Sequence, residues 1–142
     1  MAHWRIRRAQ AVRGRWSPPG DKSITHRAVI LGLLAEGRTQ IRNFLEADDC
    51  LRTVAIARQL GARIERMEEG VWMVEGVGGA LQEPSEVLDA GNSGTTARLM
   101  AGVLASAPIF SVLTGVPGAE SWSRSSGWAP PSMGDRTARV CR

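Results

Sequence analysis

A chain of 142 residues is long enough for one domain with its own core, and its 43% hydrophobic and 23% charged residues are those of an ordinary soluble globular protein. The net charge of +4 raises the question of nucleic-acid binding, but five arginines lie in the first fifteen residues and four follow Ser123, away from any interleaved aromatic pattern. A basic balance of this kind suits small anionic metabolites, so we expect such partners and no nucleic acid.

The cysteines and the apolar runs bear on the compartment. Cys50 and Cys141 provide neither a metal-ligand spacing nor a disulfide framework, which is typical of a reducing cytoplasm. The longest apolar run, residues 28–35, is far shorter than the roughly 18 residues that cross a bilayer, and no signal-peptide pattern opens the chain. The sequence therefore predicts a cytoplasmic protein with no membrane contact and no metal site.

The first half of the chain alternates strand and helix signals. Residues 4–12 fit an edge strand, and Ser-Pro-Pro-Gly at 17–20 breaks any regular element. Periodicity then predicts a helix at 23–35, a strand at 39–44 and a helix that follows Ala-Asp-Asp at 47–49 and closes at Gly61. Asp48 and Asp49 are interpreted as capping residues of that helix.

The second half repeats the beginning of this order. The expected elements are strands at 63–66, 71–75 and 87–89, a helix at 93–105 and a strand at 109–114. Residues 116–142 show neither helix nor strand periodicity. We therefore expect an α/β domain over residues 1–115 and a separate tail over residues 116–142.

Two glycine-led loops open onto apolar helices, and in each an arginine follows seven residues after the glycine, at 20–27 and 91–98. The first backbone N–H groups of a helix are unpaired and carry about half a positive charge, so a helix start binds phosphate or carboxylate. Two such starts suggest two anionic groups, and their similarity suggests one structural unit used twice.

The first loop groups three polar side chains at one helix start. Lys22 lies at its mouth, and Ser23 and Arg27 are four residues apart, which places them on one helical face. A lysine is disfavoured there by the helix dipole, so an anionic partner explains its presence. His26, inside the same turn, is interpreted as a structural or supporting group and not as a catalytic base.

In the second loop, Asn92 or Ser93 is the expected N-cap, and Gly94 has no side chain to keep an oxyanion from the backbone amides. Gly91 and Gly94 also fit a simpler interpretation, a tight strand-to-helix turn. Arg98 is a weaker candidate because it falls on the helix flank. The sequence at 91–96 lacks the GxxxxGK spacing and the lysine of a P-loop, so that mode of nucleotide binding is not expected.

Both loops, in their order and separation, resemble the N-terminal part of the 5-enolpyruvylshikimate-3-phosphate (EPSP) synthase family, the 3-phosphoshikimate 1-carboxyvinyltransferases. The resemblance covers residues 13–115 and includes Glu-Gly at 36–37, Ala-Asp-Asp at 47–49 and Leu-Gly-Ala at 60–62. The sister transferase that acts on a UDP-sugar has a different first loop and ranks below it. The resemblance implies an α/β fold of βαβαββ units, of which this chain holds about one and a half units of one lobe.

The resemblance also implies a reaction, transfer of the enolpyruvyl group from phosphoenolpyruvate to the 5-hydroxyl of shikimate 3-phosphate, in the shikimate pathway of aromatic amino-acid biosynthesis. It implies no cofactor and a monomeric full-length enzyme. On the matching residues, Lys22 touches both substrates as the catalytic group, while Ser23 and Arg27 hold shikimate 3-phosphate. The phosphoenolpyruvate side, which the herbicide glyphosate occupies, consists of Asn92, Gly94 and Thr95.

After Gly115 the chain departs from the family, because Val-Pro-Gly-Ala-Glu-Ser-Trp stands where the family has a basic segment that enters a helix. Codons from Gly118 onward, read two bases later, permit the peptide GRVLEPLLRLGAPIYGRPDG, which resembles that helix. We hypothesise that a deletion or sequencing error near residues 116–118 shifted the reading frame and left a disordered tail without the family's residues.

The family's acid and base carboxylates, and much of its cationic clamp, belong to segments beyond those that this chain matches. A partial site that is open to water loses the orientation and desolvation that catalysis needs. We therefore expect this chain to be inactive alone. The alternative is a non-catalytic anion- or phosphate-binding fragment with weak affinity for shikimate 3-phosphate.

Overall fold

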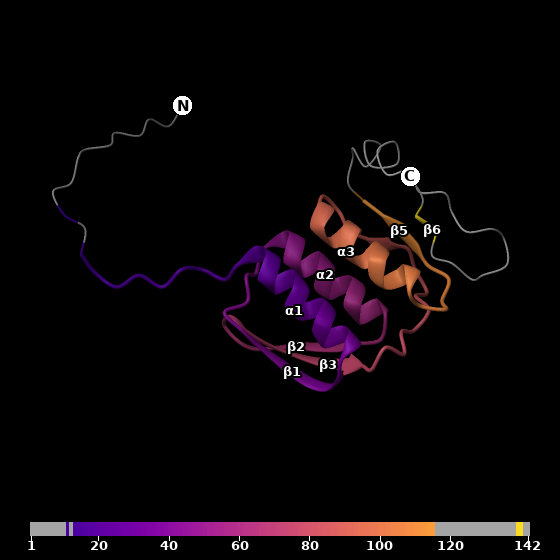
Figure 1. Cartoon of the computed structure of the whole chain (residues 1–142), viewed down its shortest axis with the longest axis horizontal. Helices are drawn as coiled ribbons and strands as arrows, with labels where there is room; N and C mark the ends of the chain where they lie inside the picture. The colour runs from indigo at the N-terminus through magenta and orange to yellow at the C-terminus, as the bar shows by residue number, and fades with distance from the viewer. Residues whose placement is uncertain (1–10, 12, 116–138, 141–142) are drawn as a thin grey trace, which may run out of the picture.

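The computed structural model describes residue 11, residues 13–115 and the backbone of residues 139–140. Three helices lie side by side, and a three-stranded sheet covers one side of α1 and α2 (Figure 1). The elements in chain order are α1 (Lys22–Leu34), β1 (Glu36–Arg42), α2 (Asp48–Gln59), β2 (Arg63–Glu68), β3 (Val71–Val77), β4 (Leu88–Asp89), α3 (Gly94–Ala105), β5 (Val112–Thr114) and β6 (Arg139–Val140). The strand expected at residues 4–12 and the disordered tail expected after Gly115 fall, apart from residue 11 and β6, outside the described residues.

The first sheet has the order β1-β3-β2, and β3 pairs antiparallel with both neighbours. The first pairing runs from Glu36 opposite Val77 to Arg42 opposite Val71. Helix α1 packs closely on the central strand, because a Cβ placed on Gly76 would lie 2.2 Å from the carbonyl oxygen of Gly32. Because Gly76 has no side chain, the backbone of α1 can pack directly against the backbone of β3.

The second sheet has the parallel order β4-β5-β6, and α3 forms the crossover between β4 and β5. Leu88 pairs with Leu113, and Asp89 pairs with Thr114. The second glycine loop therefore runs from the end of a parallel strand into a helix start, which is a common place for anionic ligands in α/β proteins. The two-residue strand β6 was not predicted, since so short a segment carries no periodicity.

One hydrophobic core joins the two halves of the described fold. Side chains from every helix and from both sheets take part in it. The largest fully buried apolar side chains are Leu33, Ile56, Leu60, Leu88, Met100 and Leu104. Full burial of a side chain of this size stabilises a fold by about 1.5–3 kcal/mol, so this core fixes the three helix starts relative to one another. Within the described residues, the helices are too short or too polar to cross a membrane.

The three predicted helices are confirmed to within two residues at each end. The predicted strand at 39–44 was wrong in its limits, because the strand spans Glu36–Arg42. It ends there because Asn43 adopts a left-handed conformation with φ 56°, which breaks the extended backbone.

Candidate functional site at three helix starts

The start of α1 has an acidic cap that leaves two amides free. Asp21 is the N-cap, and its Oδ1 accepts a hydrogen bond from the Ile24 N–H at 2.8 Å. Among the described residues, nothing accepts a hydrogen bond from the N–H groups of Lys22 and Ser23. Ser23 is thus the second residue of the helix. The signal for Asp21 was present in the sequence, because aspartate is a preferred N-cap.

The start of α3 repeats this arrangement. Ser93 is the N-cap, and its Oγ accepts a hydrogen bond from the Thr96 N–H at 3.2 Å. Within the part of the chain that the structure describes, the N–H groups of Gly94 and Thr95 have no acceptor. Of the two expected cap residues, Ser93 therefore takes the role, and Asn92 remains exposed beside it.

The loop glycines serve different purposes. A Cβ placed on Gly20 would lie 2.0 Å from the Asn43 carbonyl oxygen, so Gly20 permits close backbone packing. Gly91 has φ 55°, and its N–H donates to Asp89 Oδ1 at 2.7 Å, which makes it a turn residue. A Cβ on Gly94 would meet no atom within 4 Å. Gly94 alone of these three has open space in front of its backbone.

Lys22 forms an ion pair with Asp49, the second residue of α2. The hydrogen bond and the negative charge of Asp49 raise the pKa of the Lys22 ammonium above its ordinary value. The lysine side chain stays 49% exposed, so it is reachable from solvent. Lys22 is therefore a positive charge and hydrogen-bond donor at neutral pH, and it is a poor base.

The interpretation of Asp48 and Asp49 as caps was wrong. Helix α2 has Ala47 at its N-cap position, without a side-chain hydrogen bond, and the two carboxylates occupy its first turn. Negative side chains are stabilised there by the helix dipole, and Asp49 adds the contact with Lys22. The contact joins residues 27 positions apart, which local spacing cannot reveal.

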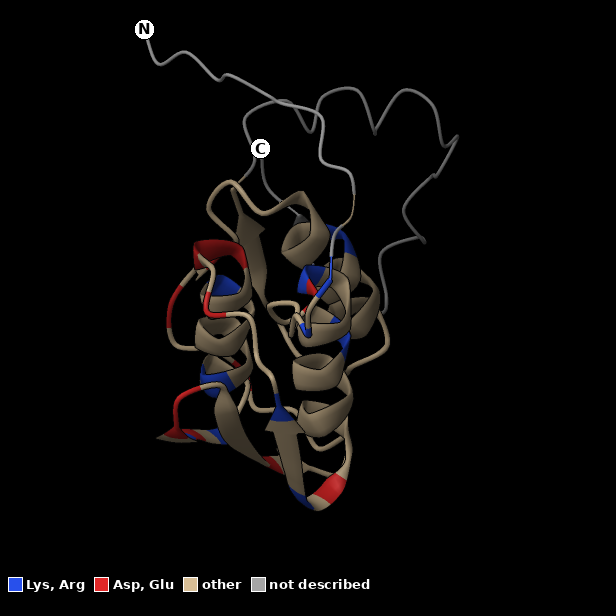
Figure 2. Cartoon of the chain, turned by 90° about the vertical axis from the view of Figure 1, so that its left-hand side faces the viewer, with Lys and Arg blue, Asp and Glu red and all other residues tan. Residues whose placement is uncertain are grey.

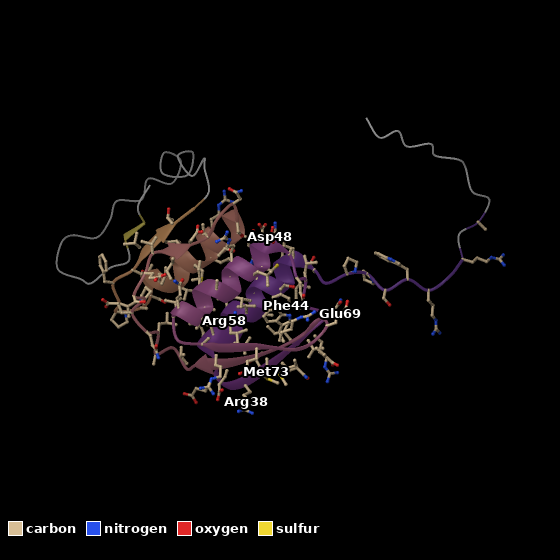
Figure 3. All side chains as sticks on the ribbon, turned by 180° about the vertical axis from the view of Figure 1, so that it is seen from behind. Arg38, Phe44, Asp48, Arg58, Glu69 and Met73 are labelled. Atoms are coloured by element: carbon tan, nitrogen blue, oxygen red, sulfur yellow. The ribbon has the colours of Figure 1, made fainter. Side chains whose placement is uncertain are left out.

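The start of α2 lies between the two glycine loops. Asp48 marks this end of the helix in Figure 3. An open hollow of about 570 Å³ brings Asn92 of the second loop together with this helix, and its walls are Asp48, Asp49, Leu51, Arg52, Ala55 and Asn92. Because Asp49 also pairs with Lys22, the two predicted groups of site residues meet around α2.

The other predicted site residues divide between the two loops. Arg27 Nη1 donates to the Ser23 carbonyl oxygen at 3.0 Å, so both residues lie on one face of α1, at its exposed side. Thr95 is half-buried at the start of α3, and Arg98 is exposed one turn further along. The structure therefore groups Lys22, Ser23 and Arg27 at one helix start and Asn92, Gly94 and Thr95 at the other.

A buried polar network lies beneath the ion pair, and sequence reasoning missed most of it. Its members are His26, Thr53, Thr96 and Ser93. His26 Nδ1 lies 2.7 Å from Thr53 Oγ1, Thr53 Oγ1 lies 2.8 Å from Thr96 Oγ1, and Thr96 Oγ1 lies 2.7 Å from Ser93 Oγ. Burial lowers the pKa of His26 below its ordinary value, which keeps the ring neutral. This position agrees with the interpretation of His26 as a structural group.

Charge is mixed over the described fold. Figure 2 shows Lys and Arg segments interspersed with Asp and Glu segments. Between residues 13 and 115 acidic residues slightly outnumber Lys and Arg, so the positive net charge comes from the two ends of the sequence. The described residues thus provide local cationic groups at helix starts in place of a broad basic face.

Comparison with known proteins gives a consistent result. A family model for EPSP synthase (3-phosphoshikimate 1-carboxyvinyltransferase) matches residues 6–121. The chain is 53% identical over 105 residues to a 3-phosphoshikimate 1-carboxyvinyltransferase of Methylobacterium radiotolerans, which covers 73% of this chain and 23% of that protein. It is 51% identical over 116 residues to the one of Rhodospirillum rubrum, covering 78% and 26%.

A solved structure of the same family resembles the fold of this chain. The structure of EPSP synthase from Acinetobacter baumannii superposes with a TM-score of 0.70 at 40% identity, over 76% of this chain and 24% of that one. The chain thus spans about a quarter of the length of the proteins it matches. The partial α/β fold predicted from the sequence is confirmed by this superposition. By the extent of the family match, the chain belongs to the EPSP synthase family.

Proposed function

We propose that this chain supplies the N-terminal substrate-binding part of an enolpyruvyl transferase, which moves the enolpyruvyl group of phosphoenolpyruvate to the 5-hydroxyl of shikimate 3-phosphate. Family membership supports the reaction class. The observation that carries the proposal is the pair of free amides at each of two neighbouring helix starts, Lys22 with Ser23 and Gly94 with Thr95. Two anionic substrates require two such anion sites.

The two helix starts differ in what they offer a ligand. The α1 start adds the guanidinium of Arg27 and the hydroxyl of Ser23, which suits the phosphate of shikimate 3-phosphate. The α3 start adds the exposed amide of Asn92 and the open space at Gly94, which suits the smaller phosphoenolpyruvate. We assign Lys22, Ser23 and Arg27 to the first ligand, and Asn92, Gly94 and Thr95 to the second.

We assign Lys22 to both ligands. Its ammonium is charged at neutral pH, Asp49 raises its pKa further, and the ion pair with Asp49 brings it to the start of α2. In the reaction the 5-hydroxyl gives up its proton and adds to the enolpyruvyl carbon while the methylene takes up a proton. Phosphate then leaves the tetrahedral intermediate as the new methyl group gives up a proton, which restores the double bond. A fixed ammonium stabilises the negative charge on the phosphate and the carboxylate through both steps.

We further propose that the chain alone binds its ligands and does not turn them over. Addition requires a group that takes the hydroxyl proton and a site that excludes water. The Lys22 side chain is 49% exposed, and its carboxylate neighbour Asp49 is held in the ion pair. The same proposal places a monomeric full-length enzyme in the cytoplasm, without nucleic-acid or membrane partners.

A phosphate-release assay on the purified chain tests this proposal. With both substrates present, we expect no release above that of the Lys22→Met variant, together with saturable binding of each substrate by calorimetry. Release that depends on Lys22 would contradict the proposed inactivity. Binding of inorganic phosphate as tight as that of both substrates would instead favour the alternative, a non-catalytic phosphate-binding fragment.

A further inference from the structure

The contact of Thr96 with the Asp49 carbonyl oxygen gives the threonine and serine part of the buried polar network a direction of hydrogen bonding. The Asp49 carbonyl oxygen can only accept, and Thr96 Oγ1 donates to it at 3.2 Å. A hydroxyl has one hydrogen, so the contact between Thr96 and Thr53 at 2.8 Å requires Thr53 to donate. Ser93 Oγ accepts from the Thr96 N–H and donates to Thr96 Oγ1. Every hydrogen and lone pair of Thr96 Oγ1 is thereby used.

The same direction fixes the tautomer of His26. Because the Thr53 hydrogen points to Thr96, the 2.7 Å contact between Thr53 Oγ1 and His26 requires Nδ1 to carry the proton. His26 Nε2 is then a bare acceptor, and the Sγ of Cys50 lies 3.8 Å from it. Burial raises the pKa of the Cys50 thiol, so the thiol keeps its hydrogen, which either His26 Nε2 or the Lys22 carbonyl oxygen, also 3.8 Å from Sγ, can accept.

The network connects all three helix starts one turn below the surface. His26 is four residues after Lys22 on α1, and Thr53 is four residues after Asp49 on α2, so both pairs stack in two layers. Thr53 and Thr96 have no exposed surface, and neither can touch a ligand. The α1 and α3 starts are therefore joined through the hydroxyl of Thr53, which lies in the middle of the network.

We propose that Thr53 is a positioning residue, whose hydroxyl sets the α3 start and its free amides relative to the α1 start and Lys22. This inference rests on the proposed function of the two helix starts. Without the hydroxyl, the Nδ1–H of His26 and one lone pair of Thr96 lose their partners in a buried place. The cap formed by Ser93 and Thr96 then keeps only the contact of Thr96 with the Asp49 carbonyl oxygen on α2, and the N–H groups of Gly94 and Thr95 turn away from the ligand.

The tautomer of His26 gives a test that needs no ligand. The two ring nitrogens are observed by long-range ¹H–¹⁵N correlation in the uniformly labelled 142-residue chain near neutral pH. We expect a protonated Nδ1 and a bare Nε2. A protonated Nε2 with a bare Nδ1, or a ring that averages both forms as in water, overturns the inferred network.

Two substitutions of Thr53 then test its role, with phosphoenolpyruvate as the probe. Thr53→Val keeps the shape and removes the hydroxyl, whereas Thr53→Ser keeps the hydroxyl. We expect Thr53→Val to weaken phosphoenolpyruvate binding by about fivefold or more, and Thr53→Ser to restore most of the affinity. A residue with a merely structural role would lower the melting temperature and leave the affinity of the folded protein unchanged.

The outcomes separate the two claims. Folded Thr53→Val with unchanged affinity overturns the role of Thr53 and leaves the proposed function standing. An unsubstituted chain that does not bind phosphoenolpyruvate contradicts the proposed function itself, and the inference falls with it. If Thr53→Val does not fold, two other measurements decide the role of Thr53. One is the tautomer of His26, and the other is the affinity of Thr53→Ser for phosphoenolpyruvate compared with that of the unsubstituted chain. A Thr53→Ser variant that loses affinity overturns the inference.

Discussion

His26 Nδ1 lies 2.7 Å from Thr53 Oγ1, and this contact is one helical turn below the ion pair between Lys22 and Asp49. Helices α1 and α2 therefore meet through two polar layers at their N-terminal ends. The upper layer is open to solvent and carries charge, whereas the lower layer is buried and neutral. The upper layer can take part in binding, and the lower layer holds it in place.

Substitution of Lys22 tests the upper layer. Lys22→Met removes the ammonium and leaves Asp49 unpaired beside the ligand, so we expect affinity for shikimate 3-phosphate to fall by about tenfold or more. The melting temperature should change little, because an exposed ion pair contributes little to stability. Arg38→Met is the matched control, since Arg38 is an exposed cation on β1, away from Asp48 in Figure 3. An equal loss of affinity for shikimate 3-phosphate in both variants would indicate a general charge effect and contradict a specific role of Lys22.

Glycine substitutions on α3 separate binding from folding. Neither Gly94 nor Gly102 has an atom within 4 Å of an added Cβ, so Gly94→Ala and Gly102→Ala should both fold. In the helix interior, Gly102→Ala should gain up to about 1 kcal/mol of unfolding free energy. Gly94→Ala should weaken phosphoenolpyruvate binding by about tenfold or more, because its methyl group stands before the free amides. Calorimetric titration of both variants measures this, and unchanged binding by Gly94→Ala would refute the assignment.

The buried His26 should make the stability of the fold depend on pH. Burial lowers the pKa of His26, an effect opposed by the charge of Asp49 and supported by the charges of Lys22 and Arg27. The unfolded chain takes up its proton near the ordinary pKa of 6.5, above the folded value, so it binds more protons in this range. The neutral His26 ring thus contributes to stability above pH 6.5, and this contribution is lost as the pH falls below that value.

Urea unfolding between about pH 8 and pH 5 measures this dependence. One titrating group can change the free energy of unfolding by at most about 1.4 kcal/mol per pH unit. His26→Gln should flatten the slope in that range. A profile that is identical in the unsubstituted chain and in His26→Gln would show that His26 is not buried as a neutral group.

The boundary at Gly115 remains a proposal, and its test lies in the gene. If the frame is shifted, the codon of Ser121 begins with TC and that of Ser123 is AGC, because only these choices give Val and then Glu-Pro in the shifted peptide. Trp122 contributes its invariant TGG to both reading frames. Resequencing of the DNA across these codons decides the matter, and an AG codon at Ser121 would exclude the shift.

Local sequence signals predicted the helices and both glycine loops. Periodic apolar residues, breakers such as Gly61 and cap residues such as Ser93 act within a few positions, so they can be interpreted without the fold. Helix α3 illustrates this, since its buried residues Met100 and Leu104 follow Thr96 at intervals of four.

Contacts that close over long stretches of chain could not be predicted in this way. The pair of Lys22 with Asp49 and the contact of Thr53 with Thr96 depend on how α2 packs between α1 and α3. Thr53 in particular looks like an ordinary polar residue of an amphipathic helix. Its burial arises only because α1 and α3 cover it from two sides.

The starts of α1 and α3 are proposed to bind two different anions. Backbone ¹H–¹⁵N shifts of the 142-residue chain, followed during titration with each substrate, measure this binding residue by residue. Shikimate 3-phosphate should shift the amides of Lys22 and Ser23, and phosphoenolpyruvate should shift those of Gly94 and Thr95, each with saturation. Saturable shifts confined to other amides, or no saturable shift with either substrate, would contradict the account.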